Sequence, residues 1–137
     1  MIRGLDHIGI AVSDLEAALR TYEDALGLRC RHRETVEEQD VKTAFLPFGD
    51  TRLELLESLS PQGPIGRFIG RRGEGIHHLC FAVDDIRESL ARCREAGIPL
   101  IDEEPRLGAD RKWVAFVHPR GLHGVLIELS QPAEDPA

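Results

Sequence analysis

Two kinds of run are missing from this sequence, and each absence excludes a class of partner. No stretch approaches the roughly 18 consecutive apolar residues that mark a membrane-spanning helix. No run of Lys and Arg exceeds two residues, and 24 acidic against 17 basic residues give a net charge of -7, which would repel a phosphate backbone. We therefore expect neither a membrane nor a nucleic acid as a partner.

Cysteine is scarce, and its spacing has no pattern. Cys30, Cys80 and Cys93 are odd in number and form no C-x-x-C motif, so neither a disulfide framework nor a thiolate zinc site is expected. The apolar stretch within residues 1–12 is too short, and charge returns too soon after it, for a signal peptide. We expect a reducing compartment, the cytoplasm.

Several enzyme motifs are also missing. The sequence contains no G-x-S-x-G, no P-loop and no G-x-G-x-x-G, which leaves nucleophilic hydrolases and nucleotide-phosphate or dinucleotide sites without support. What is present is a chain of 137 residues, 42% hydrophobic and 30% charged, which is typical of one globular domain. We therefore treat residues 1–137 as a single domain.

An internal repeat organises the chain. The segment LDHIGIAVSDLEAAL from Leu5 aligns without a gap on IHHLCFAVDDIRESL from Ile76, at an offset of 71 residues. Five aligned pairs are identical: His7/His78, Ala11/Ala82, Val12/Val83, Asp14/Asp85 and Leu19/Leu90. In both copies bulky apolar residues alternate with a histidine and small residues, which predicts a strand with one packing face and one face that leaves room around the imidazole.

A helix signature follows each predicted strand. Ser13-x-x-Glu16 reads as a capping box in the first copy and Asp85-x-x-Glu88 opens the second, and glycines end both helices. Each half then continues with strand patterns and reads as βαβββ. The predicted strands are roughly 28–35, 41–48 and 51–57, then 100–101, 112–118 and 124–130. The modules span about 5–57 and 76–130, joined by a linker over 58–75 with one helical turn around 65–71 and followed by a frayed tail, 131–137.

A glutamate repeats as well. Glu54 lies between two leucines and Glu128 between Ile127 and Leu129, so alternation places each acid on the face opposite the packed one, the same face as the histidine. Either glutamate alone is more often a solvated strand residue or an ion-pair partner of an Arg, and a lone strand histidine is most often a satisfied core or surface residue, but a buried carboxylate is costly unless it is paired or coordinated. Because both halves repeat the set, a 2-His-2-Glu metal centre of His7, Glu54, His78 and Glu128 is favoured, with ligands that suit Zn, Co, Ni, Mn or Fe.

Seven segments, taken in order, resemble the vicinal oxygen chelate superfamily and, within it, the methylmalonyl-CoA epimerases: DHIGIAVSDLEAAL, VEEQDV, GDTRLELLE, GEGIHHLCFAVDDI, LIDEEPRLG, HPRG and GVLIEL. The resemblance implies an α+β fold, in which tandem βαβββ modules form a half-open eight-stranded barrel around a metal site. It places the family's ligands on His7, Glu54, His78 and Glu128, although the second is Gln in some members. It implies cobalt, with Mn, Ni or Zn as alternatives, and a homodimer.

The implied reaction interconverts (R)- and (S)-methylmalonyl-CoA, a small-molecule acyl-CoA, by removing and returning the C2 proton through a metal-stabilised enediolate. Some bacterial members carry a catalytic Glu where this chain has Thr43, which cannot act as a base. Our hypothesis assigns Glu128 to one face of the substrate and Glu38, or a metal-bound water, to the other. Arg111 and Lys112 could meet the phosphates of CoA, but solvation at the surface is the simpler interpretation.

Three other functions share this scaffold. A glyoxalase I-like lactoylglutathione lyase tends to have an Arg on the first strand, and HIGIAV offers none. A non-catalytic small-molecule binding module commonly lacks the metal ligands. An extradiol dioxygenase uses a 2-His-1-carboxylate iron site, which Glu54 as a fourth ligand would crowd. The lyase and the binding module remain the alternatives to the epimerase.

Overall fold

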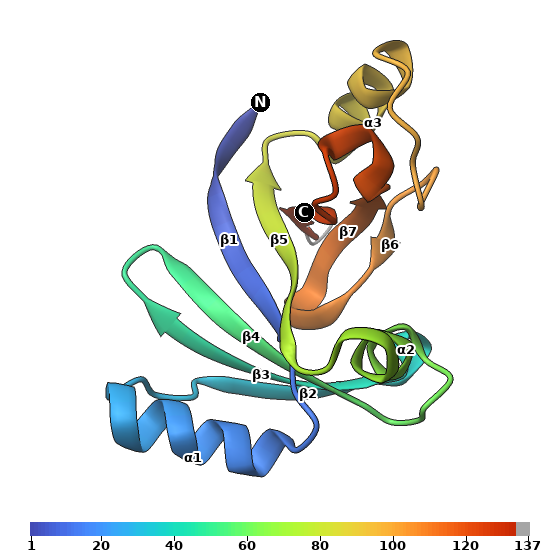
Figure 1. Ribbon diagram of the computed structural model, residues 1–137. Helices are drawn as coiled ribbons and strands as arrows, with labels where there is room; N and C mark the ends of the chain where they lie inside the picture. The colour runs from blue at the N-terminus through green and yellow to red at the C-terminus, as the bar shows by residue number, and fades with distance from the viewer. Residues whose placement is uncertain (134–137) are drawn as a thin grey trace. The chain divides into compact units, whose positions relative to one another are not determined.

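A computed structural model describes residues 1–133 of the chain, which fold as two compact units (Figure 1). The first unit is His7–His77; the second combines Met1–Asp6 with the chain from His78 onward. Among the described residues, no helix is both long and apolar enough to span a bilayer. Each unit is a sheet with helices, and the predicted α+β class with its repeated βαβββ order and eight strands is confirmed.

In the first unit the strand order is β2-β3-β4-β1, and only the β1–β4 pair is parallel. Helix α1 follows β1 and packs on the bulky face of the sheet, where Val12, Leu15, Leu19 and Leu55 are buried. The predicted packing face of the first strand is therefore confirmed. The elements are β1 (Ile2–Ala11), α1 (Leu15–Leu26), β2 (His32–Val36), η1 (Glu37–Gln39), β3 (Val41–Phe48), β4 (Thr51–Ser58) and α2 (Pro64–Arg72).

In the second unit the order is β1-β5-β8-β7-β6, to which β1 contributes its N-terminal part. The backbone N–H of Asp84 donates to the carbonyl of Met1 at 3.1 Å, next to the end of β5. Helix α3 packs on the bulky face, burying Val83, Leu90 and Leu129. The elements are β5 (Gly75–Val83), α3 (Ile86–Glu95), β6 (Arg106–Leu107), η2 (Ala109–Arg111), β7 (Lys112–Val117), η3 (Pro119–Leu122) and β8 (Ile127–Pro132).

The two main helices begin in the same way. Asp14 caps α1 by accepting from the N–H of Ala17 at 3.1 Å, and Asp85 caps α3 by accepting from that of Glu88 at 3.1 Å. The prediction for α3 is confirmed, whereas the prediction that Ser13 caps α1 was one residue early. The gapless repeat already pairs Asp14 with Asp85, and the N–H of Ser13 instead donates to Glu74.

Several predicted boundaries need correction. The segment 58–75 contains a full helix, α2, because its apolar residues pack on the sheet. The second strand begins at His32 rather than at 28, and residue 100 forms only an isolated bridge to Val117. The short strand β6 was not predicted, since two residues carry no periodic pattern.

The predicted tail is also corrected at its start. Gln131 and Pro132 belong to β8, where Gln131 lies opposite Trp113 and its side chain accepts from the N–H of Ile86 at 2.8 Å. A capping contact to the neighbouring helix thus holds this residue in the strand. The rest of the predicted tail, residues 134–137, lies outside the described part of the chain.

Candidate functional site

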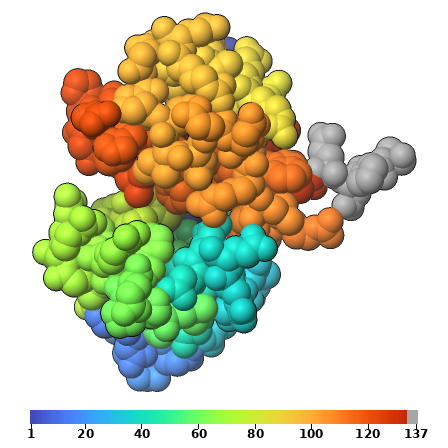
Figure 2. All heavy atoms as spheres, turned by 90° about the vertical axis from the view of Figure 1, so that its right-hand side faces the viewer, coloured from blue at the N-terminus to red at the C-terminus, as the bar shows by residue number. Residues whose placement is uncertain are grey.

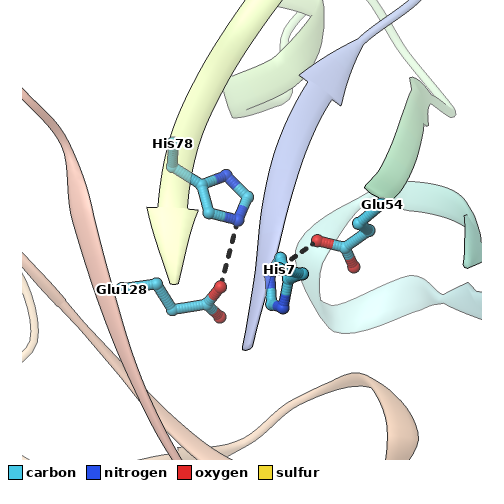
Figure 3. Close-up of side chains that lie close together, drawn as sticks. All are labelled: His7, Glu54, His78 and Glu128. Carbon is cyan, nitrogen blue, oxygen red and sulfur yellow. Dashed lines mark ion pairs between the residues drawn. The ribbon is translucent and has the colours of Figure 1, made fainter. Parts of the chain in front are cut away.

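In the first unit, β1 and β4 bring His7 and Glu54 together. The parallel register places Gly9 opposite Glu54, two residues after His7 on the same face of β1, so the imidazole and the carboxylate come from neighbouring strands. His7 Nε2 lies 3.1 Å from Glu54 Oε1 (Figure 3), and the two side chains are only 6% and 7% exposed. A buried donor and a buried acceptor therefore satisfy each other.

The second unit repeats this pair. His78 on β5 and Glu128 on β8 lie 3.0 Å apart, again from Nε2 to Oε1 (Figure 3), with 3% and 8% of their side chains exposed. Cys80 takes the place that Gly9 has in the first unit, directly opposite the glutamate in a parallel pair of strands. The structure thus brings together the predicted His and Glu within each unit.

A phenylalanine completes each pair. Phe45 lies opposite Glu54 across β3 and β4, and its ring meets His7 edge-on at 5.8 Å and 78°. Phe116 lies opposite Glu128, and its ring meets His78 at 5.4 Å and 83°. The sequence did show that these aromatics are 71 residues apart, like the histidines, but inside apolar strands they read simply as core.

An arginine lies over each of these rings. The guanidinium of Arg52 is 4.1 Å from the Phe45 centroid, and that of Arg106 is 5.9 Å from the Phe116 centroid. Arg106 also pairs with Asp102 at 3.4 Å. The negative face of each ring attracts the guanidinium. Each phenylalanine therefore contacts both a histidine and an arginine. Sequence reasoning missed both arginines, which come from strands of unlike length.

The geometry of each pair suits metal binding. Imidazole nitrogen and carboxylate oxygen are both common ligands, and all four side chains are of metal-binding types and are buried. Ligands about 2.1 Å from an ion and at right angles around it lie roughly 3.0 Å apart. The separations are 3.1 and 3.0 Å, so a cation could take the place of the direct N–O contact within either pair with little movement of the side chains.

The other residues singled out from the sequence lie elsewhere. Glu38 is exposed in η1. Thr43 is buried, and its hydroxyl donates to the carbonyl of Glu34 at 3.3 Å, so this position offers no carboxylate. His77, next to His78 in the sequence, packs edge-on against Phe68 at 5.0 Å.

Comparison with known proteins agrees with this arrangement. Residues 6–116 match the model of the Glyoxalase/Bleomycin resistance protein/Dioxygenase superfamily. The chain is 44% identical over 131 residues to the uncharacterized protein YqjC of Bacillus subtilis, covering 96% of this chain and 94% of that one. It is 38% identical over 133 residues to the ethylmalonyl-CoA/methylmalonyl-CoA epimerase of Cereibacter sphaeroides, covering 96% and 99%.

Solved structures similar to this chain also include methylmalonyl-CoA epimerases. A variant of Streptomyces coelicolor methylmalonyl-CoA epimerase in complex with 2-nitronate-propionyl-CoA superposes with a TM-score of 0.94 at 35% identity, covering 99% of this chain and all of that one. From this match, the family model and the repeated His–Glu pairs, we conclude that the chain belongs to the glyoxalase, bleomycin resistance protein and dioxygenase superfamily, among relatives that include methylmalonyl-CoA epimerases.

Proposed function

We propose that this protein is a metal-dependent epimerase that interconverts (R)- and (S)-methylmalonyl-CoA, with His7, Glu54, His78 and Glu128 as ligands of one divalent ion. One observation carries the proposal: both units contain a buried His–Glu pair with the spacing of neighbouring ligands on a metal. The named epimerases among the relatives support the substrate class.

The ligand set determines which chemistry is accessible. Two neutral imidazoles and two carboxylates balance the charge of a divalent cation, and among the candidate metals we expect cobalt, with Mn, Ni or Zn as substitutes. A bound ion would supply Lewis acidity for the charge that develops on the substrate oxygens. Phe45 and Phe116 hold the histidine rings edge-on, which limits how far the ligands can turn.

Inversion at C2 requires that one proton leaves and another arrives from the opposite side. We assign the first transfer to Glu128: its carboxylate takes the C2 proton, the electron pair of the C–H bond becomes the C1–C2 double bond, and the π pair of the thioester carbonyl moves onto its oxygen. Glu38 is our candidate for the other side, where its protonated carboxyl gives a proton to C2 as the C1–C2 π pair forms the new C–H bond and the thioester carbonyl is restored. Thr43 takes no part, because its hydroxyl is not basic and is engaged with a backbone carbonyl.

The decisive assay is C2 hydrogen exchange in deuterated water. We expect methylmalonyl-CoA to exchange its C2 hydrogen in the presence of Co²⁺ and to stop exchanging after chelation. If Glu38→Gln keeps full activity, Glu38 is not the second proton-transfer group, whereas the roles of the metal ligands and of Glu128 are unaffected. Turnover of the methylglyoxal–glutathione adduct, with no exchange of methylmalonyl-CoA, would instead select the lactoylglutathione lyase alternative.

The proposal also includes a cellular compartment and an oligomeric state. Cys30, Cys80 and Cys93 are all free thiols, which suits the cytoplasm. We expect a homodimer, as the family resemblance implies, and sedimentation of the metal-loaded protein would measure its mass. A monomer that is fully active would remove dimerisation from the proposal but leave the chemistry in place.

A further inference from the structure

Helix α2 presents a basic surface in an acidic chain. Arg67, Arg71 and Arg72 are exposed, and residues 58–73 contain no Asp or Glu although the net charge of the chain is -7. Within residues 1–133 no carboxylate forms an ion pair with any of these three side chains, which we call the α2 arginines. In contrast, Arg33 pairs with a glutamate.

The stability of the helix does not account for all three. Arg71 and Arg72 lie in the last turn, where the helix dipole favours a cation. Arg67 lies one turn earlier, four residues before Arg71, and like charges at this spacing repel each other. Arg72 is held over the ring of Phe68, 5.8 Å from its centroid. The repulsion between Arg67 and Arg71 is therefore not offset at Arg67 by the helix dipole, and a bound anion would relieve it.

Helix α2 lies on the same face of the first unit's sheet as the His7–Glu54 pair. Its Ile65 is buried against Ala11 and Leu56. Because side chains alternate along a strand, Ala11 shares a face with His7, and Leu56 shares one with Glu54. The outer side of the helix, seen as green to yellow-green atoms in Figure 2, is part of the molecular surface.

The distance from the pair to the α2 arginines follows from the same placement. Leu56 is about 7 Å along the strand from Glu54. A helix with its side chains is about 10–12 Å across, so the arginines lie on the order of 15 Å from the pair. The pantetheine arm that separates the thioester of an acyl-CoA from its phosphates has a similar extended length.

Two contacts fix the helix at this place. A Cβ added at Gly66 would collide with the backbone carbonyls of Ser60 and Pro61, so the helix backbone rests directly on the preceding loop. On the other side Phe68 packs against His77. The arginines are therefore carried by a positioned element rather than by a free loop.

We propose that the α2 arginines bind the diphosphate and 3′-phosphate of the acyl-CoA whose acyl end reacts beside the His7–Glu54 pair. This inference rests on the proposed function. Guanidinium groups match phosphate oxygens in geometry and charge. In a chain of net charge -7, such a patch also offsets the repulsion that a polyanionic substrate meets. Lys112 serves this role poorly, since its ammonium lies 2.6 Å from Asp6.

Calorimetric titration with unacylated CoA tests the inference without turnover and without metal. The variant is Arg67→Gln combined with Arg71→Gln. The matched control is Arg20→Gln combined with Arg92→Gln, which removes the same charge from exposed positions on α1 and α3. We expect the affinity for CoA to fall about tenfold or more in the α2 variant and to change by less than about twofold in the control.

Kinetics with the acyl-CoA separate binding from chemistry. The KM of the α2 variant should rise by the same factor, with kcat unchanged, since these arginines do not contact the reacting carbon. Equal CoA affinity in wild type and α2 variant would overturn the inference, even if the epimerase activity is found. If wild type binds no CoA and exchanges no C2 hydrogen, the proposed function itself fails, and the inference fails with it.

Discussion

The two units keep one His–Glu pair each but surround it differently. In the first, Gly9 stands opposite the acid and Leu56 follows it by two residues. In the second, Cys80 stands opposite, and Ser130 follows Glu128 at the same interval. The repeat thus preserves the His–Glu pairs, while Ser130 makes the surroundings of the second acid more polar than Leu56 makes those of the first. This difference fits our assignment of metal binding alone to Glu54 and of metal binding with proton transfer to Glu128.

An ion pair on the surface also recurs at equivalent positions of the two units. Both terminal guanidinium nitrogens of Arg33 donate to the carboxylate of Glu16 on α1. At positions 71 residues later, Arg87 of α3 pairs with Glu104 at 3.3 Å, so the charges are exchanged but the contact is kept. At this contact the two units therefore share the ion pair but not the identity of the residues that form it.

The largest difference between the units should appear in turnover. We expect Glu128→Gln to lower C2 exchange about a hundredfold or more, because a general base is lost. Glu54→Gln should lower it by less than about tenfold, since an amide oxygen can still bind the metal. Exchange is measured at saturating metal, with bound metal quantified in each variant. Equal losses in both variants would mean that the two acids have the same role.

Truncating an equivalent core leucine should destabilise the two units by a similar amount. Leu19 and Leu90 are equivalent in the repeat and both buried, at 5% and 1% exposure. Truncating either to Ala should cost about 2–5 kcal/mol, from lost burial and the cavity left behind. Urea unfolding monitored by circular dichroism measures this loss. A cost confined to one of the two variants would contradict the equivalence of the packed faces.

A smaller effect of opposite sign is expected at Ser130. Its hydroxyl is buried and has no hydrogen-bond partner among the described residues. Ser130→Ala should therefore raise the free energy of unfolding by about 1 kcal/mol. Ser89→Ala is the control, because that hydroxyl is exposed and bonds to the carbonyl of Asp85. A loss of stability in Ser130→Ala would show that the hydroxyl has a partner, such as water, in solution.

The smallest expected effect is on the Tm and comes from the Glu16–Arg33 ion pair, whose charges are reversed at the equivalent positions of the second unit. The hydrogen bond from Arg33, opposed by some desolvation, holds the pKa of Glu16 below its ordinary value. The pair therefore stabilises the fold above the unfolded pKa of the acid, and this contribution is lost as the pH falls through the folded pKa. Glu16→Arg should lower the Tm slightly at neutral pH and low salt, and adding Arg33→Glu should restore it.

High salt should screen these charges and remove the difference between the variants, which differential scanning calorimetry can follow. A Tm that is the same in the single and double variants at low salt would mean that the contact contributes nothing to stability, and that its recurrence in both units has another cause.

The packed strand faces, the two histidines and the two glutamates could be predicted from the sequence. Alternation identified the packed faces of β1 and β5, and the gapless repeat identified His7 and His78 before any fold was known. The acids followed because a charged residue between two apolar ones in a strand must face away from the core. All these features can be recognised within short segments of sequence or by aligning two such segments.

Features that depend on distant segments could not be predicted. Residues 1–6 join the second unit, through pairing next to Asp84, although the repeat assigns the first strand to module 1. The full length of helix α2 was missed because four glycines and a proline interrupt it or flank it, and its packing on Leu56 stabilises it. The two phenylalanines beside the histidines were hidden among ordinary apolar strand residues.

The most direct test of the central claim is the number of metal ions bound per chain. We expect the protein stripped by chelator to take up one Co²⁺ per chain, measured by elemental analysis after dialysis. We expect His7→Ala and His78→Ala each to abolish that uptake, because both pairs are needed for one ion. Two ions per chain, or one ion retained after the loss of either histidine, would contradict the account.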